Sequence, residues 1–520
     1  MSCFSRLFDN NNNTYMSYIL NMTCISFIRN NIMYCVITIC IVILILYYLY
    51  FKYKANEVIL DENINANDVS ELNLTPVFNT VHVKNVSDIV NTIHNAMIEE
   101  RTVSMCGTKH SMGGQSIANM GYRLDMTNFN KILGLDLERK LVTVEPGILW
   151  CDLIRLLNKY GLSPMTLQSY STFSVGGSIS VNAHGITNDY SLAESIFEIS
   201  ILNAKNKIVI CNRKTNPELF SLVIGGYGLF GVMLSITLRV VPNAKLHVKK
   251  YNLNTDTFHT KYEKILKNKN VNVKLARINI DNMNEIYLYC YFDNGDSSNN
   301  IISNLSKDPS KMSVNTQVLY KWLLPLRTMQ KLRYKMERES NKPLDVTYDV
   351  IDRNQLLYES AEPLAKLYNG IIDLNKTHIL QEYFIPPDKF KDWMMFLQKY
   401  FVNKLMLNSV LLNITIRYVK KDDITFLKYA KNDCYAFVFY FRISKDKHGD
   451  KELNNIHLDL TDEAIKLGGL FYLPYRHHYD KFQLLTCYPE MEDFMKMKLK
   501  YDPKCMFSNL WYDFVKELIE

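Results

Sequence analysis

A chain of 520 residues, 48% of them hydrophobic, is long enough to form two or three domains with substantial cores. Its 60 Lys and Arg against 53 Asp and Glu leave a net charge of +7 without a dense basic stripe, so no nucleic-acid partner is expected. Eleven scattered cysteines without a CxxC pair favour neither a zinc site nor a disulfide framework, and no metal site is predicted.

The N-terminal part predicts a tail followed by a membrane segment. Residues 1–31 are rich in Asn and lack periodicity, so we expect a disordered tail. Residues 32–51 are apolar and uncharged, and are long enough to cross a ~30 Å hydrocarbon core as one helix. A signal peptide is disfavoured because the run is too long and no cleavage site follows. We therefore expect a single-pass membrane protein with a polar linker over residues 52–74, in a membrane and an orientation that the flanking charges leave open.

Strand and helix patterns predict a first α+β domain over residues 75–244. The stretches VHVKNV, SDIVNTIHNAMIEE and TVSMCG indicate strand, helix and strand. A further strand at KLVTVEPG, a helix around Trp150–Tyr160, and a hairpin formed by FEISILNA and KIVIC follow. The helix NPELFSLVI then leads into the strand VMLSITLRVV.

The pattern changes after residue 245 and predicts a second α+β domain over residues 245–478, lying over the first. VNVKLARINI, NEIYLYCYF, HILQEYFIP, LLNITIRYV and YAFVFYFRI alternate as antiparallel strands do, and a long amphipathic helix separates the first two from the rest. Residues 479–520 predict a C-terminal helical segment that returns to the first domain.

Three loops of small residues stand out in the first domain: Cys106–Ser116 (CGTKHSMGGQS), Ser171–Gly185 (STFSVGGSISVNAHG) and Gly225–Val232 (GGYGLFGV). Because Gly has no Cβ, such loops let a backbone approach a ligand closely, with amide N–H groups pointing at an anion. The loops fit neither the GxGxxG fingerprint nor the P-loop. They favour a phosphate-bearing cofactor held by backbone amides.

The order of the motifs adds a resemblance. CGTKHSMGGQS, VEPGILWCDL, FSVGGSISVNAHG and NPELFSLVIGGYGLFGV resemble the flavin-binding half of the oxygen-dependent FAD-linked oxidoreductases, which have the vanillyl-alcohol-oxidase or PCMH-type fold and include sugar-lactone and alditol oxidases. YDPKCMFSNLWY is similar to that family's C-terminal end. The resemblance implies FAD held between two α+β subdomains, with a cap domain over the isoalloxazine ring.

The same resemblance implies a set of cofactor contacts and leaves two alternatives for His110. His110 stands at the GxxHS position where many relatives bond a histidine to the flavin 8α-methyl group, and the alternative is a noncovalent contact at the dimethylbenzene edge. His184 is expected to be a flavin-contacting or structural residue. The implied FAD contacts are Gly107, Thr108, Lys109, His110, Ser111, Met112, Gly113, Gly114, Gln115, Gly147, Ser174, Val175, Gly176, Gly177, Ser180, Asn182, His184, Gly185, Gly231 and Val232.

Four residues of the second half are candidates for catalysis. HHYDK (His477–Lys481) resembles the family's His-Trp-x-Lys pattern near the substrate, with Tyr479 in place of Trp, which implies His478 as a base and Lys481 as a charge stabiliser. Glu382 and Arg417 stand at cap-strand positions that face the flavin in relatives. The alternative for each of the four is a surface or ion-paired residue.

Together these features predict a membrane-anchored flavoenzyme that oxidises the CH–OH group of a small alcohol, sugar or lactone by hydride transfer to FAD. Oxygen or another acceptor would then reoxidise the flavin. Two alternatives remain open. One is an FAD- and NAD(P)H-dependent reductase of a C=C bond, like the membrane-anchored sterol reductases of the same superfamily, and the other is a catalytically inactive, membrane-tethered structural relative.

Overall fold

The computed structural model describes Val42 and residues 64–293, 295, 301–305, 327–343, 349–359, 375–402, 404–407 and 409–520. Apart from Val42, these residues belong to one compact unit that spans residues 61–370 and 375–520. No helix within these ranges is long and apolar enough to cross a membrane. The tail expected over residues 1–31, the membrane segment expected over residues 32–51 apart from Val42, and residues 52–63 of the linker lie outside the described residues.

A small parallel sheet carries the first small-residue loop. Helix α2 begins at a capping box in which Asn85 accepts a hydrogen bond from the amide of Asp88 at 3.1 Å, and it buries its apolar face against Leu124 and neighbouring strand residues. The loop in question leaves the sheet directly after its edge strand β4. The elements are β1 (Asn65–Ala66), β2 (Thr75–Pro76), β3 (Asn79–His82), α2 (Val86–Ile98), β4 (Val103–Cys106) and β5 (Tyr122–Asp125), with sheet order β3-β5-β4.

A second, antiparallel sheet follows, with strand order β10-β9-β11-β7-β6 and β8 paired to β11. The hairpin and the helix expected here are present as the β9–β10 pair and as α3, whose Leu153, Ile154 and Leu157 are buried in the main core. The elements are β6 (Ile132–Asp136), β7 (Leu141–Val144), α3 (Trp150–Asn158), β8 (Leu162–Pro164), α4 (Val175–Ser180), η1 (Leu192–Ser195), β9 (Ile196–Leu202), β10 (Ile208–Asn212), α5 (Pro217–Val223) and β11 (Val232–Pro242).

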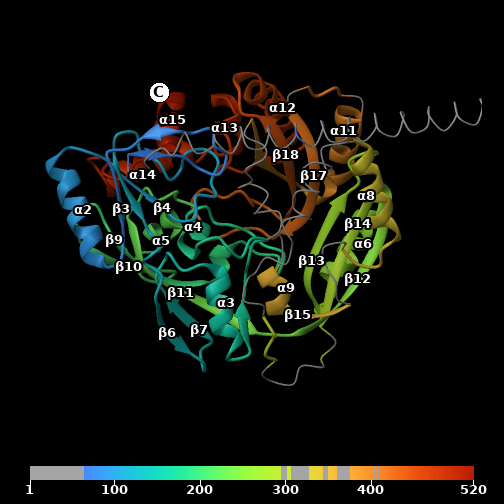
Figure 1. Ribbon diagram of the computed structural model, residues 1–520, viewed down its shortest axis with the longest axis horizontal. Helices are drawn as coiled ribbons and strands as arrows, with labels where there is room; N and C mark the ends of the chain where they lie inside the picture. The colour runs from blue at the N-terminus through green and yellow to red at the C-terminus, as the bar shows by residue number, and fades with distance from the viewer. Residues whose placement is uncertain are drawn as a thin grey trace, which may run out of the picture. The chain divides into compact units, whose positions relative to one another are not determined.

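The second half of the chain forms an antiparallel sheet with the order β15-β12-β14-β13-β17-β18-β16-β19, here called the cap sheet. Figure 1 shows α6 and α11, which contact each other, on one side of this sheet, and α3 and α9 on the other. One face of the sheet is thus turned toward the first half of the chain.

The elements of this half are β12 (Lys245–Asn254), α6 (Thr255–Leu266), β13 (Val271–Ile278), β14 (Glu285–Asp293), α8 (Arg327–Glu339), β15 (Val350–Asp352), α9 (Arg353–Glu359), β16 (Lys376–Ile385), η2 (Pro387–Lys389), α11 (Phe390–Phe401), β17 (Ser409–Val419), β18 (Cys434–Ser444), α12 (Lys447–Lys466) and β19 (Leu470–Phe471). The amphipathic helix that the sequence predicts before β15 is described only over α8.

The C-terminal residues run back to the first sheet. After α13 (Lys481–Cys487) and α14 (Met491–Tyr501), the chain passes beside β4, where the amide of Val103 donates to the carbonyl of Met506 at 2.7 Å and the amide of Ser508 donates to the carbonyl of Val103 at 3.2 Å. Helix α15 (Leu510–Ile519) ends the chain. The last residues therefore extend the parallel sheet by one more backbone partner.

Candidate active site

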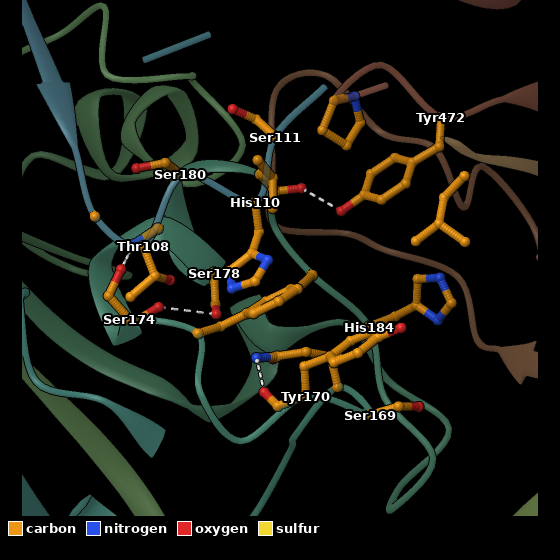
Figure 2. Close-up of a pocket in the computed structure, with 18 of the residues that line it drawn as sticks. Thr108, His110, Ser111, Ser169, Tyr170, Ser174, Ser178, Ser180, His184 and Tyr472 are labelled. Carbon is orange, nitrogen blue, oxygen red and sulfur yellow. Dashed lines mark hydrogen bonds between the residues drawn. The ribbon is translucent and has the colours of Figure 1, made fainter. Parts of the chain in front are cut away.

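A cavity of about 430 Å³ lies between the small-residue loops and the inward face of the cap sheet. Its wall is formed by the loop after β4, by the segment around α4, by the turn before β11 and by alternate residues of β16, β17 and β18. Figure 2 shows His110 reaching into this hollow beside Ser178, with His184 and Tyr472 farther along the wall. Segments that are hundreds of residues apart in the sequence thus converge on one site.

The loop after β4 offers main-chain donors to the cavity. Among the hydrogen bonds of the described residues, none uses the amides of Thr108, His110 or Ser111 as a donor, and all three residues line the wall. A Cβ at Gly107 would lie 2.1 Å from Oγ of Ser174, so the two loops approach this closely only because residue 107 is Gly. Free amides on a wall of small residues suit the diphosphate of a flavin dinucleotide.

The segment around α4 is held in place by its own hydroxyl groups. Ser174 Oγ accepts from the amide of Gly177 at 3.3 Å, and Ser178 Oγ donates to the carbonyl of Ser174 at 3.0 Å (Figure 2). A Cβ at Gly176 would lie 2.6 Å from Cβ of Pro146, so α4 packs directly on the turn that precedes α3. This part of the wall is therefore rigid and free of large side chains, as a bound flavin requires.

His110 occupies an apolar niche of the wall. Its imidazole stacks on the ring of Phe173 at a centroid distance of 4.1 Å, and Phe173 in turn stacks on Tyr170 at 5.2 Å. Burial lowers the pKa of His110 to about 4. The imidazole is consequently neutral at physiological pH, so its ring nitrogens keep a lone pair for bonding.

On the opposite side of the cavity, Glu382 of β16 forms the centre of a buried polar cluster. Nε2 of His184 lies 2.6 Å from Oε2 of Glu382, and the hydroxyl of Tyr475 donates to Oε1 at 2.6 Å. Arg417 of β17 lines the same wall and donates to Ser169 Oγ at 2.8 Å. Both oxygens of the carboxylate are thus occupied, and a guanidinium lies beside it.

The charge state of Glu382 follows from this arrangement. Burial is the largest single influence and would raise the pKa, but His184, Arg417 and the Tyr475 hydroxyl together outweigh it and lower the pKa of Glu382 below its usual value. Burial and the neighbouring carboxylate raise the pKa of Tyr475 well above its usual value. Glu382 is therefore an anion and Tyr475 a neutral donor.

The inward face of the cap sheet continues the wall as a row of polar side chains. Asn413, Thr415 and Arg417 follow one another at alternate positions of β17, and all three line the cavity. A β-bulge between Leu411 and Asn413 sets the start of this row. In the described residues neither Asn413 nor Thr415 has a side-chain hydrogen-bond partner, so both are available to a ligand.

Two predicted catalytic residues lie elsewhere. His478 is buried outside the cavity wall, where its ring nitrogens contact His457 at 3.0 Å and Asp450 at 3.2 Å. Lys481 is exposed at the start of α13 and donates to the carbonyl of Ile519. The prediction that these two act as base and charge stabiliser is corrected: the chain turns away from the cavity after Tyr475, and neither side chain reaches it.

The predicted cofactor contacts divide in a similar way. Those that line the cavity are Gly107, Thr108, Lys109, His110, Ser111, Gln115, Ser174, Gly176, Gly177, Ser180, His184, Gly231 and Val232. Those that do not are Met112, Gly113, Gly114, Gly147, Val175, Asn182 and Gly185.

The second group shapes the wall from behind. The amide of Gly114 donates to Asp68 at 3.0 Å, and the side chain of Asn182 turns to Asp422 at 2.9 Å. A Cβ at Gly147 would lie 1.8 Å from the carbonyl oxygen of Met126. The small size of these residues serves backbone packing, and the sequence pattern does not distinguish this use from contact with a ligand.

Four residues at the site were absent from the sequence predictions: Asn413, Thr415, Tyr472 and Tyr475. The first two share the inward face of β17 with Arg417, so the two-residue period of a strand could have pointed to them. Tyr472 donates to the carbonyl of Val181 at 2.6 Å (Figure 2), and Tyr475 to Glu382. No local pattern marks these two tyrosines, because they lie in a non-repetitive segment after β19.

The sequence was compared with known proteins. Residues 79–212 match the family model of an FAD binding domain, and residues 358–515 match the model of D-arabinono-1,4-lactone oxidase. L-gulonolactone oxidase of Bos taurus is 25% identical over 450 residues, which cover 82% of this chain and 92% of that protein. D-arabinono-1,4-lactone oxidase of Candida glabrata is 27% identical over 162 residues, 30% of this chain and 31% of its own. Cytokinin dehydrogenase 2 of Arabidopsis thaliana is 30% identical over 133 residues, 25% of this chain and 26% of its own.

The two matched regions correspond to the two sides of the cavity. The first contains the loop after β4 and the segment around α4, and the second contains the strands that carry Glu382 and Arg417. The donor groups and the glycine-lined approach of the first region fit the cofactor that this match implies. The chain therefore belongs to the FAD-linked oxidoreductases, enzymes that join a PCMH-type FAD-binding domain to a lactone-oxidase-type domain, and FAD is its cofactor.

Proposed function

We propose that this enzyme oxidises the CH–OH group of a sugar lactone or a related polyol, and that oxygen or another acceptor reoxidises the flavin. The observation that carries the proposal is that one cavity joins the FAD-side loops to an ionised Glu382 beside Arg417. The names of the relatives, L-gulonolactone oxidase and D-arabinono-1,4-lactone oxidase, support the substrate class.

The residues of the chain divide the work between the two sides of the cavity. We assign the FAD phosphates to the free amides of Thr108, His110 and Ser111. When bound, FAD accepts a hydride from the substrate carbon. Arg417 offers a fixed positive charge where negative charge develops, and Glu382 keeps that guanidinium in place. Thr415, next to Arg417 on β17, offers a hydroxyl that can bind a neighbouring hydroxyl of the substrate.

His110 is the residue that we assign to covalent attachment of FAD. The assignment is supported by its neutral imidazole and by its stacked position at the wall, which keeps the ring from turning into solvent. A neutral nitrogen with a free lone pair is the form that bonds to an electrophilic carbon. The noncovalent alternative predicts that the flavin is released when the protein is denatured.

We also propose that residues 32–51 anchor the enzyme in a membrane as a single helix, on the grounds of their apolar, uncharged sequence. The test is alkaline carbonate extraction of membranes from cells that express the full chain or residues 55–520. The full chain should stay with the pellet, and the shortened chain should be released. Release of both would refute the anchor.

The activity is tested by adding substrates anaerobically to the purified full-length chain and following the visible flavin absorbance. L-gulono-1,4-lactone or D-arabinono-1,4-lactone should bleach the flavin, and NADPH should not. Bleaching by NADPH would favour the C=C reductase instead, and a purified chain without flavin would favour the inactive relative. Oxygen admitted after bleaching should restore the colour if oxygen is the acceptor.

A further inference from the structure

The imidazole of His184 is enclosed at the cavity wall by Glu382 and three aromatic rings. The Nε2–Oε2 distance is 2.6 Å, and only 2% of the His184 side chain and 5% of the Glu382 side chain are exposed. The rings of Phe384, Tyr429 and Tyr472 surround the imidazole at centroid distances of 5.5 to 6.1 Å. Nδ1 is buried and has no hydrogen-bond partner in the described residues. A proton on Nδ1 would be unsatisfied, so the proton lies on Nε2 and is donated to Glu382.

The main chain fixes this donor on both sides. His184 forms an isolated antiparallel bridge with Ser191. A Cβ on the following Gly185 would lie 2.0 Å from the carbonyl oxygen of Leu167, so the loop is pressed against the strand region beside it. The imidazole therefore cannot swing away from Glu382 without a shift of the loop. The pair is pre-organised before any ligand binds.

Titratable groups from four segments face Glu382. They are His184 from the loop after α4, Arg417 from β17, Tyr429 from the connection between β17 and β18, and Tyr472 and Tyr475 after β19. Of these, His184 and Tyr475 donate directly to the carboxylate, and Arg417 acts through its charge. Burial alone would favour the protonated acid. The anion persists because these three neighbours stabilise it.

Resting on the function proposed above, we propose that His184 is a positioning residue for the oxidation. By donating Nε2–H to Glu382, it keeps the carboxylate ionised, and the carboxylate in turn holds the Arg417 guanidinium at the place where the CH–OH group reacts. His184 takes up no proton in this scheme, because both of its ring nitrogens are turned to buried surroundings. Its effect reaches the substrate through the charge of its partner.

The first test compares His184→Ala and His184→Gln with the wild type in the full-length holoenzyme. The rate of anaerobic flavin reduction by L-gulono-1,4-lactone is measured between pH 5.5 and 9. Without the donor, the pKa of Glu382 rises, so the acid limb of His184→Ala should move to higher pH. A shift of one unit makes the loss at pH 6 about tenfold larger than the loss at pH 8.5. His184→Gln keeps an N–H donor and should restore most of the wild-type profile.

A second readout does not depend on turnover. A carboxylate whose folded-state pKa is depressed adds stability above its unfolded pKa, and this stability is lost as pH falls through the folded pKa. The Tm difference between wild type and His184→Ala should therefore be wide at pH 8 and narrow toward pH 5. His457→Ala is the matched control, because His457 is equally buried but lies outside the cavity wall. It should lower Tm without moving the acid limb.

Loss of the same factor at every pH in His184→Ala, with FAD still bound, would overturn the proposal. So would a folded His184→Gln that fails to restore the profile. If no lactone reduces the wild-type flavin, the proposed function itself fails, and the dependence of Tm on pH still decides whether His184 holds Glu382 ionised.

Discussion

The most direct consequence of the buried imidazole concerns how FAD attachment depends on pH. With a pKa of about 4, His110 is about 0.91 neutral at pH 5 and about 0.999 neutral at pH 7. An imidazole with the ordinary pKa of about 6.5 would be about 0.03 neutral at pH 5 and about 0.76 at pH 7. If the neutral imidazole attacks the flavin, the attachment rate should change by about 1.1-fold between these pH values, compared with about 25-fold for an exposed histidine.

The assay mixes apo-protein with FAD at pH 5, 6, 7 and 8 and follows the flavin that stays with the protein after acid precipitation. His110→Ala is the control. It should release all of its flavin, and the loss of one ring contact, worth about 0.5–1.5 kcal/mol, should weaken noncovalent FAD binding by no more than about tenfold. An attachment rate that rises more than tenfold from pH 5 to pH 7 would refute the argument that burial keeps the imidazole neutral.

Three further predictions follow from close contacts. Gly185→Ala places a Cβ 2.0 Å from a main-chain carbonyl and should lower the FAD content of the purified protein, as measured from its absorbance ratio; full FAD content would show that the loop is not confined. Lys498→Met leaves Asp502 buried without its cation, at a cost of about 3–5 kcal/mol, which for ~450 residues unfolding together lowers Tm by about 3–5 °C; a shift below 1 °C by calorimetry would contradict the ion pair. Thr415→Val removes one hydroxyl at constant shape and should reduce kcat/KM for a lactone about tenfold with unchanged FAD content, whereas an unchanged kcat/KM would remove Thr415 from the substrate site.

The sequence predicts the loops of this site better than its charged cluster. Small residues such as Gly107 and Gly176 are required wherever two backbones meet, so their spacing identifies the cofactor side without knowledge of the fold. The same property makes the pattern ambiguous at Asn182, whose side chain turns into the core to reach Asp422. Residue type and spacing do not say on which side of a loop the ligand lies.

The catalytic side shows the opposite limitation. Glu382 and Arg417 lie on strands, where a two-residue period fixes the direction of each side chain once one neighbour is known. His478 lies in an irregular segment, and there the motif gives no direction. Its burial against Asp450 depends on α12, which lies well before it in the sequence. Long-range packing of this kind is not written in a short motif.

The backbone contact between Val103 and residues Met506 and Ser508 has a consequence for biosynthesis. The sheet that carries the first FAD loop is completed by residues within the last fifteen of the chain. A nascent protein that folds from its N-terminus cannot complete this sheet while its final segment is still inside the ribosome. Cofactor loading should therefore follow release of the finished polypeptide, and early termination even a few residues before Met506 should yield a protein that remains colourless.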